Sequence, residues 1–184
     1  MSEDRYGDWI QTWSGKQFWP CSPKAEDVDI WDIAHSLSNL CRYGGHVTKF
    51  YSVAEHSIHI AEALRRDGQS LDVIKWGLLH DGTEAYCADV PRPLKPYLQN
   101  YDIIESSIEK VIIEKFGLSD KIPEIVQDYD VRITVNEMTL LMPSKIDHLR
   151  KNYNWEPVPD VKIKNWTPNV AKTNFLFMYN ELFE

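Results

Sequence analysis

Apolar residues recur every three or four positions along most of this chain, a spacing that places them on one face of an α-helix. The first such run begins after Asp29, and its apolar positions are Ile30, Ile33, Leu37 and Leu40. Gly44 and Gly45 follow and are expected to end the helix, because glycine is a poor helix former. Arg42 and Tyr43 are therefore expected at a helix end.

Two further helices have recognisable start signals. Ser52 and Glu55 match a capping box, so Glu55 is interpreted as a capping residue of a second helix. The inward stripe of this helix comprises Val53, Ser57, Ile60 and Leu64. His56 lies in its first turn, near that stripe. Ser70 can cap a third helix, whose inner face carries Leu71, Ile74 and Leu78.

The next inward position after the third helix is Asp81. A carboxylate in that position needs a buried partner, because an uncompensated charge away from water is costly. A metal ion can be this partner. In a purely structural alternative, a buried arginine or histidine takes its place.

The second half of the chain continues the helical pattern after an interruption. Residues 90–96 are rich in proline and are expected to form a rigid loop that holds Lys95 in place. An amphipathic helix over residues 104–116 is expected to end at Gly117 and to contribute core packing only.

A helix that follows Pro123 carries carboxylates on its apolar face. The apolar positions of one row are Val126, Ile133 and Leu140. Asp130 and Glu137 fall on that same row, seven residues apart. Two carboxylates that point inward are not explained as solvated surface charges, so both are candidates for a buried site.

The two ends of the chain complete an all-α fold class with a short N-terminal hairpin. Residues 9–23 read as two short extended pieces joined by a turn, and residues 170–183 as a closing helix with Pro168 near its start. We expect one domain over residues 1–184. Within it, residues 1–28 form an N-terminal extension, and residues 151–184 an irregular connection and the closing helix.

The composition indicates a single globular domain and excludes some classes of binding partner. The 184 residues are 43% hydrophobic, enough for one substantial core. A formal net charge of -8 argues against binding to nucleic acid or to anionic membranes. No apolar run approaches a membrane span and no signal peptide is recognised, so a cytoplasmic location is expected. Cys21, Cys41 and Cys87 suggest neither a disulfide framework nor a cysteine zinc site.

The net charge does not exclude a small anionic ligand. Arg42, Lys49, Arg92 and Lys95 lie in the same part of the chain as the candidate site residues, and local charge decides whether a phosphate is held. Ordinary solvated surface charge is the alternative for each of them. Tyr43 and Pro93 offer surfaces that can stack on a base, or can simply pack the helix end and the loop.

The chemistry of the chain centres on the dipeptide His80-Asp81, which Glu84 follows. Together with His56 and Asp130, this dipeptide can surround one divalent ion with nitrogen and oxygen ligands. Zinc, cobalt, manganese and iron all accept such a set, and each lowers the pKa of a bound water. A hydrolase is therefore the first hypothesis. A capped helix end with a satisfied buried histidine is the structural alternative.

The order His, His-Asp, Asp on successive helices resembles the HD-domain metal-dependent phosphohydrolases. The resemblance covers roughly residues 10 to 145 and includes the compact branch from phages, prophages and bacteria, with its 5'-deoxynucleotidases and phage dATP triphosphohydrolases. It rests on three segments: residues 32–46 (DIAHSLSNLCRYGGH), 50–57 (FYSVAEHS) and 79–86 (LHDGTEAY).

The resemblance implies a role for each candidate residue. By position, the four metal ligands are His56, His80, Asp81 and Asp130. Glu84 matches the acidic residue that handles protons, Arg42 and Lys95 match phosphate-binding positions, and Glu137 matches a position that supports the fold around the site. Three further histidines are expected to be structural or to lie behind the ligands: His35, His46 and His59.

The resemblance also implies a substrate. We expect cleavage of the 5'-phosphate ester of a deoxynucleotide, with dATP giving deoxyadenosine and triphosphate. A dNMP 5'-nucleotidase of broad base tolerance is the alternative, and a nucleotide sensor without turnover is a third. We further expect a homo-oligomer, a dimer or larger, in the cytoplasm, which is the host's if the chain is phage-encoded.

Overall fold

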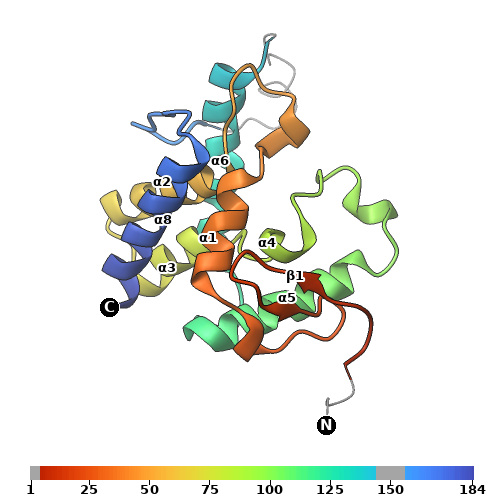
Figure 1. Cartoon of the computed structure of the whole chain (residues 1–184). Helices are drawn as coiled ribbons and strands as arrows, with labels where there is room; N and C mark the ends of the chain where they lie inside the picture. Colours follow the sequence, from red (N-terminus) through yellow and green to blue (C-terminus); the bar gives the residue numbers. More distant parts are fainter. Residues whose placement is uncertain (1–4, 144–155) are drawn as a thin grey trace.

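The computed structural model of the protein describes residues 5–143 and 156–184. Within them the fold is all-α apart from one short hairpin, as the sequence predicts (Figure 1). The helices are α1 (Ile30–Asn39), α2 (Val53–Arg66), α3 (Leu71–Leu79), α4 (Glu84–Cys87), α5 (Tyr101–Phe116), α6 (Glu124–Leu141) and α8 (Pro168–Phe183). In the part of the chain described, none of them is long and apolar enough to cross a membrane.

Helix α1 ends earlier than its glycines predict. The Asp29 carboxylate caps its start by accepting a hydrogen bond from the Trp31 backbone N–H, but the last helical residue is Asn39. The chain then becomes extended, because the Leu40 carbonyl accepts from Val53 and the Arg42 N–H donates to Tyr51. Pairing with this distant segment competes with further helix. The segment Arg42–Gly45 forms a separate 3-10 turn instead.

Helices α2 and α3 form the centre of the fold, and both serine caps are confirmed. The Ser52 hydroxyl accepts from the Glu55 N–H, and the Ser70 hydroxyl from the Val73 N–H. The two helices approach closely at Gly77, where a Cβ would lie 2.6 Å from Leu64 Cδ1. The Ala61 Cα of the α2 backbone would lie 3.2 Å from the same Cβ, so a larger residue would force the Leu64 side chain and the α2 backbone to shift.

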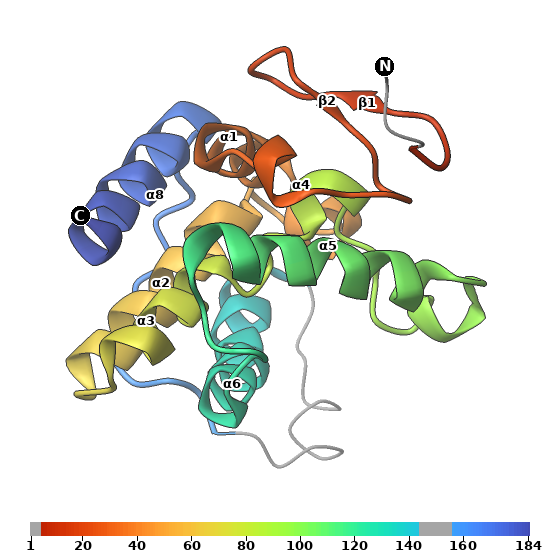
Figure 2. The ribbon, with the colours of Figure 1, turned by 90° about the horizontal axis from the view of Figure 1, so that it is seen from below.

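Helices α1, α6 and α8 pack against this centre. Helix α8 packs against α1, α2 and α3, and α6 packs against α2 and α3 (Figures 1 and 2). Helix α5 runs past the end of α4 in Figure 2 and has Gly117 as its left-handed C-cap, as predicted. Ile133 is fully buried in the predicted row of α6.

Two predicted core positions are wrong. Leu71 is 54% exposed and Leu140 is 61% exposed. Leu71 is the first residue of α3, where side chains have fewer neighbours. Leu140 lies two heptads after Val126, and a straight helix drifts by roughly 20° per heptad from a seven-residue row. Its side chain consequently turns away from the core.

The N-terminal hairpin is confirmed and is attached to α1. Strands β1 (Ile10–Gln11) and β2 (Gln17–Phe18) pair antiparallel. The Ser14 backbone N–H and hydroxyl donate to the Asp32 carboxylate of α1, and Phe18 is fully buried against Tyr86 of α4.

The two irregular passages are also confirmed where they are described. Residues 90–96 contain no regular helix beyond the first residues of a short 3-10 turn, Lys95–Tyr97. Residues 156–167 contain neither helix nor strand, whereas residues 151–155 of the predicted connection lie outside the described part.

Candidate metal centre

Three helical elements bring two histidines and one aspartate together. His56 lies in the first turn of α2, His80 caps the end of α3, and Asp130 lies in the middle of α6. One potential ligand atom from each side chain lies within 4.8 Å of the other two. This cluster can hold a metal ion.

The second nitrogen of each histidine is engaged, which directs the first nitrogen into the cluster. His56 Nδ1 donates to Glu137 Oε1 at 2.5 Å, and His80 Nδ1 donates to the Gly77 carbonyl at 2.9 Å. The two Nε2 atoms face one another at 3.3 Å, and His56 Nε2 lies 3.2 Å from Asp130 Oδ1. Metal-binding histidines are typically oriented by such outer partners.

Asp81, the remaining expected ligand, adjoins the same two nitrogens. Its Oδ2 lies 3.3 Å from His80 Nε2 and 3.6 Å from His56 Nε2. The same oxygen accepts from the Arg42 guanidinium at 3.3 Å. The arginine and histidine partners of the structural alternative are thus present, and they lie beside the cluster that can hold a metal.

Arg42 lies behind the cluster and connects its carboxylates. Its guanidinium is 3.3 Å from Asp81, 3.9 Å from Asp130 and 3.3 Å from Glu137. Glu137 is fully buried and also accepts hydrogen bonds from the hydroxyls of Tyr43 and Tyr51. Tyr43 has a left-handed backbone, with a φ of 59°, which turns its side chain toward this carboxylate. Glu137 is therefore the anchor of the site.

These contacts determine the charges of the site. Burial opposes ionisation of Glu137, but Arg42 and His56 outweigh it and lower its pKa to about 2. For Asp130, the hydrogen bond from His56 likewise overcomes burial and lowers the pKa to about 2. Burial and Arg42 disfavour a charged His56, yet Glu137 and Asp130 raise its pKa to about 9. The site stabilises a positive charge at His56 Nε2, either a proton or a metal ion.

Glu84, beside the metal cluster, has a buried carboxyl oxygen that lacks a hydrogen-bond partner among the residues described. It is the first residue of α4 and is 8% exposed. The buried oxygen is Oε2. Burial, followed by the charges of Asp81 and Asp89, raises the pKa of Glu84 well above its usual value. An unsatisfied buried oxygen of this kind calls for a partner from outside the chain, and a bound water or substrate oxygen fits it.

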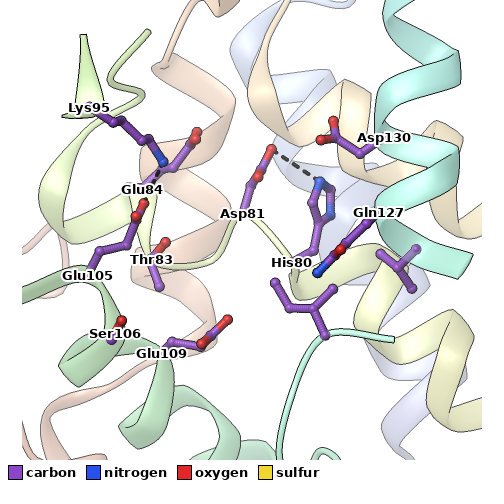
Figure 3. Close-up of a pocket in the computed structure, with 12 residues that line it drawn as sticks. His80, Asp81, Thr83, Glu84, Lys95, Glu105, Ser106, Glu109, Gln127 and Asp130 are labelled. Carbon is purple, nitrogen blue, oxygen red and sulfur yellow. Dashed lines mark hydrogen bonds and ion pairs between the residues drawn. The ribbon is translucent and has the colours of Figure 1, made fainter. Parts of the chain in front are cut away.

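Glu84 faces a cavity of about 230 Å³ beside the metal cluster (Figure 3). Asp81, His80 and Asp130 lie on one side of it, and Lys95 lies on the other next to Glu105. The complete lining is His80, Asp81, Thr83, Glu84, Lys95, Glu105, Ser106, Glu109, Ile122, Val126, Gln127 and Asp130.

The structure brings some of the expected substrate contacts to this cavity and not others. Lys95 lines it, with its ammonium group 2.8 Å from the Glu105 carboxylate. Among the residues that the structure describes, the cavity lining does not include Arg42, Tyr43 or Pro93. Pro93 is exposed on the surface. Arg92 is mostly exposed but reaches Asp130 with a contact of 3.3 Å.

The expectation that α5 contributes core packing only is wrong, because Glu105, Ser106 and Glu109 of that helix line the cavity. Gln127 also lines it from α6. Gln127 precedes Asp130 by three residues, a helical spacing that places both on one face, so this residue could have been found from the sequence. The α5 residues could not, because nothing local shows which side of that helix meets the site.

Glu55 is a second correction. Its backbone N–H is capped by Ser52, but its buried carboxylate does not complete the capping box. Instead it accepts hydrogen bonds from the backbone N–H groups of Lys164, Asn165 and Trp166. These partners lie more than a hundred residues away, beyond the reach of any local pattern.

Comparison with known proteins gives relatives whose names carry no function. The chain is 44% identical over 109 residues to the uncharacterized protein YfdR of Escherichia coli K12. It is 31% identical over 121 residues to the uncharacterized protein RCAP_rcc00048 of Rhodobacter capsulatus. The matches cover 59% and 62% of this chain and 58% and 61% of the relatives, so the chain spans about three fifths of the length of each. No protein-family model matches the sequence.

Proposed function

We propose that this protein is a divalent-metal-dependent phosphohydrolase that cleaves the 5'-phosphate ester of deoxynucleotides. The observation that carries the proposal is the unsatisfied Glu84 carboxyl, which lies in a cavity between the metal cluster and Lys95. A proton-transferring group, a cationic group and a candidate metal centre are thus arranged around one small space.

The donor set fits a transition metal. Two imidazole nitrogens and carboxylate oxygens suit zinc, cobalt, manganese or iron, and Asp81 would serve as a ligand beside His56, His80 and Asp130. When bound, the metal would supply Lewis acidity toward a phosphate oxygen and lower the pKa of water. The sequence resemblance to HD-domain phosphohydrolases supports the same assignment.

Three side chains of the protein would perform the remaining steps. The raised pKa of Glu84 favours a protonated carboxyl, which can donate its proton to the leaving 5'-oxygen as water attacks phosphorus. Lys95 can contact the phosphate oxygens and neutralise their charge. Arg42 holds Asp81 and Asp130 in position from behind, so its contribution to phosphate binding would be indirect.

Two substrates remain, and different observations favour them. The resemblance favours dATP, giving deoxyadenosine and triphosphate. The cavity favours a deoxynucleoside monophosphate: Lys95 is its one lining cation among the described residues, whereas Asp81, Glu84, Glu105, Glu109 and Asp130 are acidic. A triphosphate carries more negative charge into this lining than a monophosphate does, and like charges repel.

The experiment is a hydrolysis assay with each dNTP and dNMP and with zinc, cobalt, manganese and iron, in which the products are identified by mass. We expect a free deoxynucleoside together with triphosphate or phosphate. In isotopically labelled water, the label should appear in the released phosphate compound and not in the nucleoside. Stepwise loss of terminal phosphate, or equal use of ATP and dATP, would contradict the proposal.

A further inference from the structure

A second cleft, of about 420 Å³, lies outside the metal centre. One wall is the second half of α2 and the other is the extended segment that precedes α8. The lining comprises His59, Glu62, Ala63, Arg66, Asp160, Val161, Lys162, Lys164 and Trp166. None of these residues lines the first cavity.

The extended wall is held in place at several points. The Glu55 carboxylate accepts from the backbone N–H groups of Lys164, Asn165 and Trp166 at 2.6 to 2.9 Å. The Asn165 side chain donates to the Phe50 carbonyl at 3.2 Å. Arg66 donates to the Pro159 carbonyl at 2.8 Å. These contacts preorganise the cleft, so a ligand would not have to order it.

The cations of the cleft include two that are available to a ligand. Arg66 is paired with Asp67, which lies outside the lining. Within the described ranges, the ammonium groups of Lys162 and Lys164 have neither a hydrogen bond nor an ion pair within 4 Å. In a chain whose net charge is -8, two such ammonium groups on one wall form a local site for an anion.

Two carboxylates, Glu62 and Asp160, also line the cleft. The Glu62 carboxylate lies 3.6 Å from His59 Nδ1, and the charges of His59, Arg65 and Lys164 all act on it. Asp160 is the other carboxylate in the lining, and its charge acts on Arg66. Among the described residues, Lys162 and Lys164 are the cations of the lining that no carboxylate contacts directly.

The cleft also has an aromatic surface. The half-buried Trp166 lines it, and its ring lies 5.9 Å from the ring of His59 at an interplanar angle of 30°. An indole ring held in this way is a surface on which a flat ring of a ligand can stack. Cations and an indole on the same wall match a molecule that has both a phosphate and an aromatic ring.

We propose that this cleft binds a nucleotide-like molecule, with its phosphate on Lys162 and Lys164 and its ring against Trp166. This site is distinct from the metal centre and does not rest on the proposed hydrolysis. The cleft and the centre are adjacent through α2, because Glu55, which holds the wall, is next in sequence to His56.

The test is an NMR titration of the indole N–H signal of Trp166, which is assigned by its disappearance in Trp166→Leu. AMP is the probe, and adenosine and inorganic phosphate are the two partial probes. We expect AMP to shift the signal saturably and to bind at least tenfold more tightly than either part. The double change Lys162→Ala and Lys164→Ala should weaken AMP binding by tenfold or more. Lys110→Ala, at an exposed lysine outside both cavities, should leave it unchanged.

The readout needs neither turnover nor metal, so its result is independent of whether the protein hydrolyses nucleotides. A dispersed spectrum of the double variant will show that it is folded. The proposal is overturned if millimolar AMP leaves the Trp166 signal in place, or if the double variant binds AMP as the unmodified protein does. A signal that responds only to protein concentration would also overturn it and would indicate that a second copy of the chain covers the cleft.

Discussion

His56 and His59 lie one turn apart on α2, and both are buried beside a glutamate. The nitrogens of the two rings nevertheless have different partners. His56 uses Nδ1 for Glu137, and its Nε2 faces His80, Asp81 and Asp130. His59 has Glu55 3.4 Å from Nε2 and Glu62 3.6 Å from Nδ1, so carboxylates meet both its nitrogens.

The difference shows that the outer partners of a histidine decide its use. Glu137 orients the His56 ring, and the Nε2 of that ring faces a second imidazole nitrogen and two carboxylates, which together can surround a metal ion. Each nitrogen of His59 meets a single carboxylate, which makes a structural contact. Glu137 and Glu55 divide in the same way. Glu137 connects α6 to the ligands through Arg42 and His56, and Glu55 connects α2 to the segment before α8.

The largest expected effect comes from replacing each of the two histidines with glutamine, one at a time. His56→Gln should remove the tightly bound metal and lower phosphate release by roughly a hundredfold or more, since losing even an outer partner of a ligand costs about 10–100-fold. His59→Gln should keep both the metal and the activity. Metal content per chain, measured beside activity, checks this. Equal metal loss in the two variants would show that His56 is no more important for metal binding than His59.

Glu84→Gln should separate proton transfer from metal binding. The amide keeps the shape of the side chain but cannot donate the carboxyl proton, so turnover should fall by about a hundredfold or more while metal content stays unchanged. The matched control is Glu109→Gln, which changes another carboxylate in the lining of the same cavity. If Glu84→Gln turns over normally, the residue has no part in the reaction.

Glu137→Gln and Glu55→Gln compare the two anchors. Removing the buried Glu137 charge should weaken metal binding by about 10–100-fold, because His56 loses its orienting partner. Glu55→Gln should lower the free energy of unfolding by about 2 kcal/mol, since three backbone N–H groups lose a charged acceptor, and should leave metal affinity unchanged. Metal titration and chemical denaturation of both variants distinguish these outcomes. A loss of metal affinity in Glu55→Gln would show that Glu55 and Glu137 are energetically coupled.

The sequence predicts the order of helices and the hairpin, because these depend on local periodicity and caps. Asp130 and Glu137, for example, share a row of α6 that a seven-residue spacing reveals. The convergence of the His and Asp residues is predicted from their chemistry as metal ligands and from the family resemblance. The Glu55 contact with residues 164–166 and the place of Glu105 in the cavity depend on long-range packing. The spacing of residues along one helix contains no information about which distant segment will cover it.

The smallest expected effect is a pH dependence of stability at His59. Burial disfavours its charged form, but hydrogen bonds with Glu55 and Glu62 outweigh burial and raise the pKa of His59 above 6.5. A group whose pKa rises on folding stabilises the folded state fully below its unfolded pKa, and this contribution is lost as pH rises through the folded pKa.

Thermal unfolding of the metal-free protein from pH 6 to pH 9 measures that loss. His56, whose pKa is raised to about 9, contributes to the slope over the same range, so the contribution of His59 is the difference in slope between the unmodified protein and His59→Gln. His59→Gln should reduce the slope above pH 6.5, whereas His35→Gln should not, because burial lowers the pKa of His35. A slope of the same size in His59→Gln and in the unmodified protein would show that the carboxylate contacts of His59 do not favour its charged ring, and the contrast with His56 would then rest on geometry alone.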